Sequence, residues 1–329
     1  MSIPLDPKLD GFEIIQANYK HIGDHAIRTD ILIPRTEHSG PRPLIVRVHG
    51  GGLMMGDSLY MDWWPHWVSD LALQKNAVII SPNYRLMPEA TSFDIFADMA
   101  DFWAWLQSSL LREVLAAHTP PTAIDLDRIF VTGESAGGLL SVHLALTYPD
   151  QIRAASAAYP AVALNAETFT QPRASPPFGL DIPETLVQET LDSIALGTAV
   201  SSLTSQKRVD FMLGAIQHGF LSRLYERGAE PVPPNVLYPI LKVEQSDLKV
   251  PRGGLVVLHG RHDSVVPLRD SERFVARAQQ VLAGRLNEQG RGRVTLVVRD
   301  GEHGFDAPAR FEEDWPQEAM QDAVSAWLE

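Results

Sequence analysis

A serine between two glycines carries the strongest chemical signal in this sequence. Residues 133–137 are Gly-Glu-Ser-Ala-Gly, which fits the pattern G-x-S-x-G, with an apolar strand pattern before them and a helical pattern after them. A sharp turn between strand and helix exposes the serine hydroxyl, and small flanking residues let the backbone close. We therefore expect Ser135 to be a nucleophile. The motif alone would also fit a glycine-rich turn with an incidental serine.

A second glycine-rich stretch, His-Gly-Gly-Gly at residues 49–52, directly follows another apolar strand pattern. Consecutive glycines let backbone amides turn toward a developing oxyanion, and esterases and lipases use this form of loop. We expect the amides of Gly51, Gly52 and Ala136 to form an oxyanion hole. His49 is expected to brace the loop through hydrogen bonds. A plain glycine loop is the alternative.

The acid and the base that would activate Ser135 are expected in loops that follow two later strands. Asp263 and His303 each come after an apolar strand pattern, and serine, acid and histidine in this order is a known arrangement of a catalytic triad. His262 and Asp300 are nearby competitors for the base and acid roles. Neither keeps the same loop spacing.

Strand and helix patterns alternate regularly enough to predict the elements that carry these residues. The expected strands are 12–17, 26–33, 44–48, 77–80, 129–132, 152–158, 255–258 and 294–298, and the expected helices are 61–73, 93–110, 136–146 and one that ends at 327–328. The first two strands look antiparallel. The later alternation predicts an α/β fold with a mostly parallel sheet, helices on both faces and sites at the strands' carboxyl ends. Arg47 interrupts the third strand without an evident partner.

The pattern changes between residues 160 and 251, where prolines separate helical stretches at 183–196 and 205–227. We expect residues 165–251 to be a helical cap inserted into a single domain that spans residues 1–329. A separately folded domain is the alternative, but a segment of this length that returns directly to the sheet favours an insertion.

Composition excludes several classes of protein. The 329 residues contain 28 Lys and Arg against 41 Asp and Glu, a net charge of −13, so nucleic acid is not an expected partner. The chain has no cysteine, which excludes disulfides and thiolate metal sites, and its scattered histidines predict no metal. Neither a membrane span nor a leader over residues 1–6 is evident, and we expect a cytoplasmic protein.

Taken together, these motifs resemble the hormone-sensitive-lipase-type family of α/β-hydrolases. The resemblance covers most of the expected sheet and rests on residues 49–52, 83–89, 133–138, Asp263 with the Val-Pro that follows it, and residues 303–305. It implies cleavage of carboxylic esters through an acyl-enzyme, often with short or medium acyl chains and without a cofactor. Arg47 and the cap depart from the family pattern, which leaves the substrate open.

The resemblance also implies two alternatives. Some fungal proteins that look like this act on polyketide thioesters or lactones, so a thioesterase, acyltransferase or lactone-forming release enzyme is the runner-up, with an acyl-carrier protein as a partner. A plant hormone receptor also resembles the family and has lost its catalytic histidine. The presence of His303 favours an enzyme that acts on a small ester or thioester.

Overall fold

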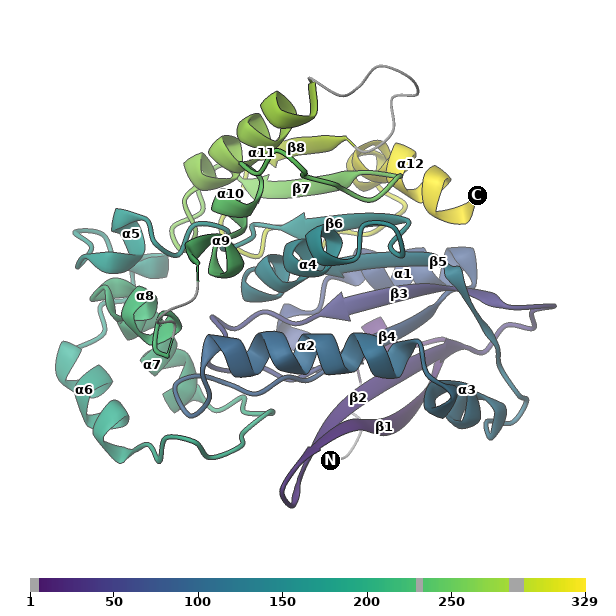
Figure 1. Cartoon of the computed structure of the whole chain (residues 1–329), viewed down its shortest axis with the longest axis horizontal. Coiled ribbons are helices and arrows are strands. Elements are labelled where there is room, and N and C mark those ends of the chain that lie inside the picture. The colour runs from purple at the N-terminus through teal and green to yellow at the C-terminus, as the bar shows by residue number, and fades with distance from the viewer. Residues whose placement is uncertain (1–5, 229–232, 284–292) are drawn as a thin grey trace.

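The computed structural model describes residues 6–228, 233–283 and 293–329, so the start of the chain, where a leader was not expected, lies outside the described residues. Within these ranges eight strands form one sheet in the order β1-β2-β4-β3-β5-β6-β7-β8 (Figure 1). The strands are β1 (Phe12–Ile22), β2 (His25–Pro34), β3 (Arg42–Val48), β4 (Val78–Pro82), β5 (Ile124–Gly133), β6 (Ala154–Ala158), β7 (Leu255–Gly260) and β8 (Val294–Arg299).

The sheet is antiparallel only at its first edge. β1 and β2 form a hairpin around Gly23, whose φ of 56° suits a tight two-residue turn, and β2 pairs antiparallel with β4. Every other neighbouring pair is parallel. The expected antiparallel start and the mostly parallel sheet are both confirmed. The carboxyl ends of β5, β7 and β8 therefore meet at the same edge.

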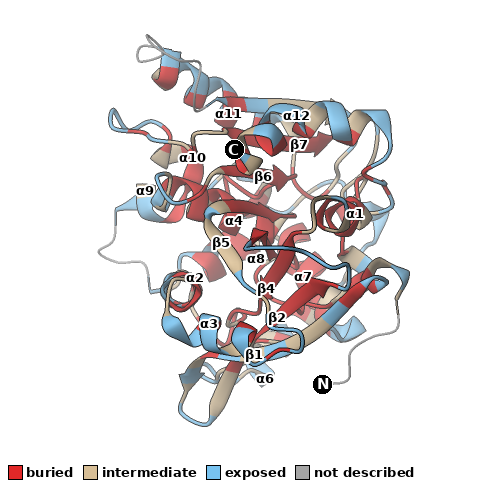
Figure 2. Cartoon of the chain, turned by 90° about the vertical axis from the view of Figure 1, so that its right-hand side faces the viewer, coloured by how far each residue is buried: buried red, intermediate tan, exposed pale blue. Residues whose placement is uncertain are grey.

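Helices cover both faces of the sheet, as expected. Outside residues 165–251 the described helices are η1 (Pro7–Leu9), η2 (Met61–Trp63), α1 (His66–Lys75), α2 (Ser92–Leu106), α3 (Ser109–Ala116), α4 (Ala136–Thr147), α11 (Leu268–Ala283) and α12 (Asp314–Leu328). α2, α4 and α11 pack on one face, and α1 and α12 pack on the other (Figure 2). In β3, Leu44 and Val46 point to the first face and Ile45 points to the second, as the two-residue period of a strand requires.

We call residues 165–251 the cap segment. It contains α5 (Glu167–Thr170), η3 (Pro177–Gly179), α6 (Glu184–Ser193), α7 (Gln206–Gln217), α8 (Phe220–Tyr225), α9 (Pro234–Leu237) and α10 (Pro239–Lys242). α5 to α8 gather at one end of the sheet (Figure 1). None of the described helices combines the length and the apolar character that crossing a bilayer requires.

Three of the expected helices are broken in the structure. Pro65 separates η2 from α1, and Ser108, which caps α3 by accepting from the amide of Leu110, separates α3 from α2. The stretch expected at 205–227 divides into α7 and α8 at Gly219. The φ of Gly219 is 73°, and an added Cβ would lie 2.8 Å from the backbone of Gln171. The chain turns there because only glycine fits.

Candidate active site

Ser135 lies at the turn between β5 and α4, as the G-x-S-x-G pattern predicted. Its φ of 57° and ψ of −117° place a non-glycine residue in a strained conformation. The flanking glycines make the turn possible: a Cβ on Gly133 would lie 2.3 Å from the carbonyl oxygen of Gly137, and one on Gly137 would lie 2.0 Å from that of Val48. The first turn of α4 therefore packs directly against the end of β3.

His303 and Asp263 both come within hydrogen-bond distance of this turn. His303 Nε2 lies 3.0 Å from Ser135 Oγ, and His303 Nδ1 lies 2.8 Å from Asp263 Oδ2. Asp300, the competing acid, is exposed and pairs with Arg261, and the competing histidine, His262, is exposed as well. The structure thus brings together the three residues predicted from the order along the chain.

The carboxylate of Asp263 is held by its own loop. Oδ1 accepts hydrogen bonds from the amides of Val265 and Val266, both at 2.8 Å. Burial acts to raise the pKa of Asp263, but the charge of His303 and hydrogen bonds from His303 and His259 hold it well below its usual range. We did not predict a role for His259 from the sequence, although its ring nitrogen Nε2 lies 3.4 Å from Asp263 Oδ2. It lies only four residues before Asp263, but that spacing alone does not predict that the ring contacts the carboxylate.

A buried polar chain supports the imidazole of His303. The ring of Tyr159 lies 4.4 Å from that of His303, between centroids, and the Tyr159 hydroxyl donates to Asp306 Oδ1 at 2.8 Å. The indole of Trp67 donates to the other oxygen of Asp306 at 3.0 Å. Burial raises the pKa of Asp306, and these two hydrogen bonds oppose the rise. Asp306, itself held by Trp67, thereby fixes the Tyr159 ring against which the imidazole of His303 packs.

The glycine loop after β3 faces Ser135. Gly51 and Gly52 have φ of 106° and 61°, and both line the same cavity as Ala136. A Cβ on Gly51 would lie 2.1 Å from the carbonyl oxygen of Met55, and one on Gly52 would lie 2.8 Å from Met212 Cγ. Within the described residues the amides of Gly51, Gly52 and Ala136 donate to no protein acceptor. They are available to a ligand.

His49 braces this loop, which confirms the expectation. Its Nδ1 donates to the carbonyl oxygen of Gly50 at 2.8 Å, and its ring stacks on Tyr84 with centroids 4.3 Å apart. The Tyr84 hydroxyl donates to the carbonyl oxygen of His49, also at 2.8 Å. Burial lowers the pKa of His49 to about 4, so the ring is neutral at physiological pH.

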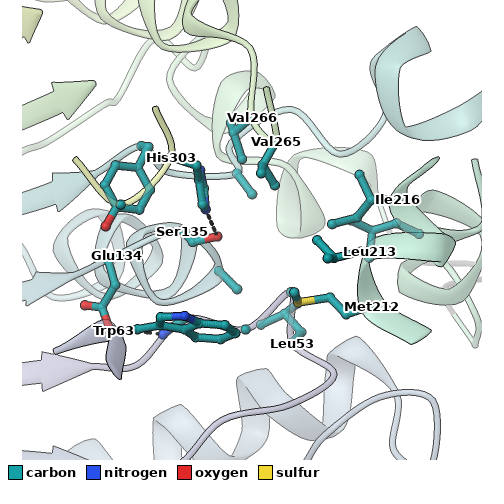
Figure 3. Close-up of a pocket in the computed structure, with 18 of the residues that line it drawn as sticks. Leu53, Trp63, Glu134, Ser135, Met212, Leu213, Ile216, Val265, Val266 and His303 are labelled. Atoms are coloured by element: carbon teal, nitrogen blue, oxygen red, sulfur yellow. Dashed lines mark hydrogen bonds between the residues drawn. The ribbon is translucent and has the colours of Figure 1, made fainter. Parts of the chain in front are cut away.

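A cavity of about 410 Å³ opens in front of Ser135. Figure 3 shows Trp63 and Leu53 along the lower side of it and Met212, Leu213 and Ile216 of α7 at the right, with Leu53 next to Met212. Its described lining is mostly apolar and contains no lysine or arginine, with Asp62 and Glu134 as its carboxylates. It comprises Gly50, Gly51, Gly52, Leu53, Asp62, Trp63, Glu134, Ser135, Ala136, Leu139, Tyr159, Ala161, Leu164, Phe169, Phe178, Leu180, Val209, Met212, Leu213, Ile216, Leu221, Val265, Val266, His303, Gly304 and Ala307.

The opening of the cavity is marked by Phe178 and Leu180, which line it while remaining 43% and 52% exposed. Phe178 has a φ of 55°, a left-handed conformation that is rare for a bulky residue. Its ring centroid lies 6.2 Å from that of His303. An apolar side chain therefore stands at the entrance, close to the imidazole.

No group of three or more His, Cys, Asp or Glu side chains within residues 6–228, 233–283 and 293–329 is arranged to hold a metal ion. The sequence expectation of a metal-free and cofactor-free site stays a prediction.

Comparison with known proteins identifies the family. The sequence model of a protein family described as having the α/β-hydrolase fold matches residues 45–194. A probable carboxylesterase of Phoma sp. is 32% identical over 340 residues, covering 99% of this chain and 100% of that protein. The chain belongs to the α/β-hydrolase family. Its resemblance to the hormone-sensitive-lipase-type members is confirmed, and it is a carboxylesterase-like member of the family.

Two further similarities are more limited. The structure of a thermophilic esterase from Thermogutta terrifontis with butyrate bound matches with a TM-score of 0.57 at 19% identity, covering 98% of this chain and 95% of that one, which supports the fold alone. A non-reducing polyketide synthase of Preussia isomera is 31% identical over 136 residues, which are 41% of this chain and 6% of that protein. The hydrolase fold expected from the sequence is confirmed.

Proposed function

We propose that this chain is a serine hydrolase that cleaves carboxylic esters through an acyl-enzyme. Ser135 attacks the acyl carbonyl while His303 Nε2 takes the hydroxyl proton. Asp263 accepts from His303 Nδ1, fixes the tautomer and stabilises the charged imidazole. His303 then returns the proton to the leaving alcohol, and water resolves the acyl-enzyme by the reverse sequence. The observation that carries the proposal is the continuous hydrogen-bonded chain from Ser135 through His303 to Asp263.

The oxyanion that forms in each half-reaction is assigned to the amides of Gly51, Gly52 and Ala136. Amides fixed before the reaction stabilise developing charge without reorganising. Ala136 is the first residue of α4, so the positive end of the helix dipole adds to the effect. The positive φ of both glycines and the absence of a protein acceptor for the three amides, within the described residues, support this assignment.

The substrate is proposed to be a small ester with an uncharged, apolar acyl group. The cavity is mostly apolar, and its described lining offers no cation to a phosphate or carboxylate. The cap segment supplies Val209, Met212, Leu213 and Ile216 to the wall. We therefore treat residues 165–251 as the substrate-selecting cap of a single domain over residues 1–329.

The test is the hydrolysis of p-nitrophenyl esters of increasing chain length by the wild type and by Ser135→Ala. We expect the variant to lose on the order of 10⁶ in kcat, as removal of a triad nucleophile does elsewhere. Ser39→Ala, at an exposed serine, is the matched control and should retain full activity. A folded Ser135→Ala protein with activity within tenfold of the wild type would rule the assignment out.

A thioesterase, acyltransferase or lactone-forming activity is the second candidate, because the chain also matches part of a polyketide synthase. Such an enzyme must keep water from the acyl-enzyme until a hydroxyl attacks it. The same cavity would serve if the acyl chain carried that hydroxyl. An N-acetylcysteamine thioester of a hydroxy acid distinguishes the two: a lactone product supports release by cyclisation, and the free acid supports hydrolysis. The retained His303 supports either enzyme over a ligand-binding receptor.

A further inference from the structure

Arg173 lies in the cap segment between α5 and η3, and its guanidinium group contacts the loop of the acid. Nη1 donates to the carbonyl oxygen of Ser264 and Nη2 donates to that of Val265, both at 2.8 Å. Nε donates to the carbonyl oxygen of Thr168 at 2.9 Å. All three nitrogens thus bind main-chain carbonyls, and no carboxylate within the described residues forms an ion pair with Arg173.

The two carbonyls on the loop belong to the peptide groups that hold the catalytic carboxylate. The peptide that carries the Ser264 carbonyl also carries the amide of Val265, and the peptide that carries the Val265 carbonyl also carries the amide of Val266. These two amides donate to Asp263 Oδ1, each at 2.8 Å. Arg173 therefore binds one end of each peptide group and Asp263 accepts from the other end.

This arrangement has two physical effects. A peptide group is planar and rigid, so a bond at its carbonyl fixes the direction of its N–H as well. A charged donor at the carbonyl also polarises the group and strengthens the N–H as a donor, because hydrogen bonds in a chain reinforce one another. Burial lowers the pKa of Arg173 to about 10, and nearby Asp263 opposes the fall, so the guanidinium stays charged at neutral pH.

A second contact from the cap supports the same loop. The amide of Phe178 donates to Ser264 Oγ at 2.8 Å. Glu302 then links this loop to the backbone of His303, because its Oε1 accepts from the main-chain amides of both Ser264 and His303, at 2.6 and 2.7 Å. The cap segment is thus connected to the loop of Asp263 and to the backbone of His303 through hydrogen bonds from main-chain amides to the side chains of Ser264 and Glu302.

We propose that Arg173 is a positioning residue through which the cap segment holds Asp263 in its reactive orientation. The inference rests on the triad role proposed above for Asp263. It divides the cap segment into two parts with different tasks. The α7 side chains that face the cavity select the substrate, whereas Arg173 maintains the reactivity of Ser135 toward every substrate.

The experiment compares Arg173→Met and Arg173→Lys with the wild type. We expect Arg173→Met to lower kcat for p-nitrophenyl butyrate by about 10²-fold with little change in KM, because small misplacement of a catalytic group has effects of this size. Phosphonylation of Ser135 by a small phosphonate should slow by the same factor. Arg173→Lys should recover part of the loss, because an ammonium reaches one carbonyl.

The matched control is Arg269→Met, which removes an exposed arginine that donates to Thr168 Oγ1 at 2.7 Å, the same residue that Arg173 contacts. It should leave kcat and the phosphonylation rate within about twofold, since exposed contacts contribute little. Equal effects of the two substitutions, or an Arg173→Met effect confined to KM and chain-length preference, would overturn the inference. If Arg173→Met does not fold, an Arg173→Lys protein with wild-type kcat would overturn it equally.

The experiment can contradict the proposed hydrolase function and the positioning role of Arg173 independently of each other. A wild type that hydrolyses no ester contradicts the proposed function, yet the phosphonylation rates still compare the reactivity of Ser135 with and without Arg173. A wild type that hydrolyses esters and is matched in kcat by both Arg173 variants contradicts the positioning role alone.

Discussion

Arg47 and Glu134 form an ion pair inside the protein, with only 1% and 4% of their side chains exposed. The guanidinium of Arg47 also donates to the carbonyl oxygen of Ser58 at 3.2 Å and lies 4.3 Å from the ring centroid of Trp64. Glu134 Oε1 accepts from the amide of Gly50 at 3.3 Å. Burial raises the pKa of Glu134, and Arg47 opposes the rise. One carboxylate therefore links β3, the glycine loop and the turn that carries Ser135.

Arg47→Met should destabilise the protein by about 3–5 kcal/mol, because removing one partner of a buried pair leaves the other charge uncompensated. The double variant Arg47→Met/Glu134→Gln should recover much of this loss, since it leaves no buried charge. Urea denaturation measures both. Lys249→Met breaks an exposed pair with Asp150 and should change stability by less than about 1 kcal/mol. Purely additive losses in the double variant would show that the pair is not coupled.

Asp263→Asn should reduce kcat by about 10⁴-fold, because an amide in place of the carboxylate favours the wrong tautomer of His303. Asp300→Asn is the control, since that exposed carboxylate pairs only with Arg261 among the described residues and should not affect turnover. Steady-state kinetics with one short ester is sufficient. If Asp300→Asn is the damaging change and Asp263→Asn is mild, the acid has been assigned to the wrong residue.

Met212→Ala should change chain-length preference, because Met212 lines the cavity and contacts Gly52. The kcat/KM ratio of a long ester to a short one should shift by about tenfold or more. The rate of labelling by a small phosphonate should stay nearly constant. Equal loss in all three measurements would mean that α7 supports the triad rather than selecting the substrate.

Phe211→Ala provides a useful contrast, because Phe211 is the neighbour of Met212 in α7. Phe211 is fully buried, does not line the cavity and packs near Arg208. Its truncation should lower stability by about 3–5 kcal/mol without altering the ratio of long to short esters. Thermal unfolding measures the loss of stability, and kcat/KM for the same long and short esters measures the ratio. A selectivity change as large as that of Met212→Ala would contradict it.

The buried ring of His49 predicts a pH dependence of stability. Its pKa in the folded chain is about 4, below the usual 6.5, so the unfolded chain binds a proton first as the pH falls. Stability should therefore decrease from pH 6.5 to 4, by up to about 1.4 kcal/mol per pH unit from this residue. His49→Asn should flatten the curve, whereas the exposed control His38→Asn should not. Parallel curves for wild type and His49→Asn would refute the effect.

The sequence was sufficient to predict most of the sheet and to predict that Ser135, Asp263 and His303 lie together, because those features are local. Ser135 sits between glycines that the turn itself requires, and Asp263 and His303 each follow a strand that predicts where the loop must emerge. The order of the three residues along the chain then predicted which would be the nucleophile, the acid and the base. Element boundaries were less certain: β5 begins at Ile124, before the expected start at residue 129, because Ile124 pairs with Arg42 although charged residues interrupt the apolar pattern at 125, 127 and 128.

Contacts between distant segments could not be predicted. Glu134 lies 87 residues from Arg47, and Ser264 lies 91 residues from Arg173, so neither pairing leaves a pattern in the sequence. Gly219 likewise breaks a helix only because the backbone of Gln171 packs against it. Such contacts depend on how the cap segment lies on the sheet, which a helical period does not specify.

The position of Phe178 implies a conflict between folding and activity that evolution and protein engineering would both encounter. An exposed phenyl ring gains little from burial, and its left-handed backbone is disfavoured by roughly 1–2 kcal/mol for a residue with a Cβ. A random library selected only for thermal tolerance should therefore accumulate glycine or asparagine at this position. Such variants would gain stability while losing the apolar entrance. Selection for catalysis, rather than for the fold, is what would keep an aromatic residue there.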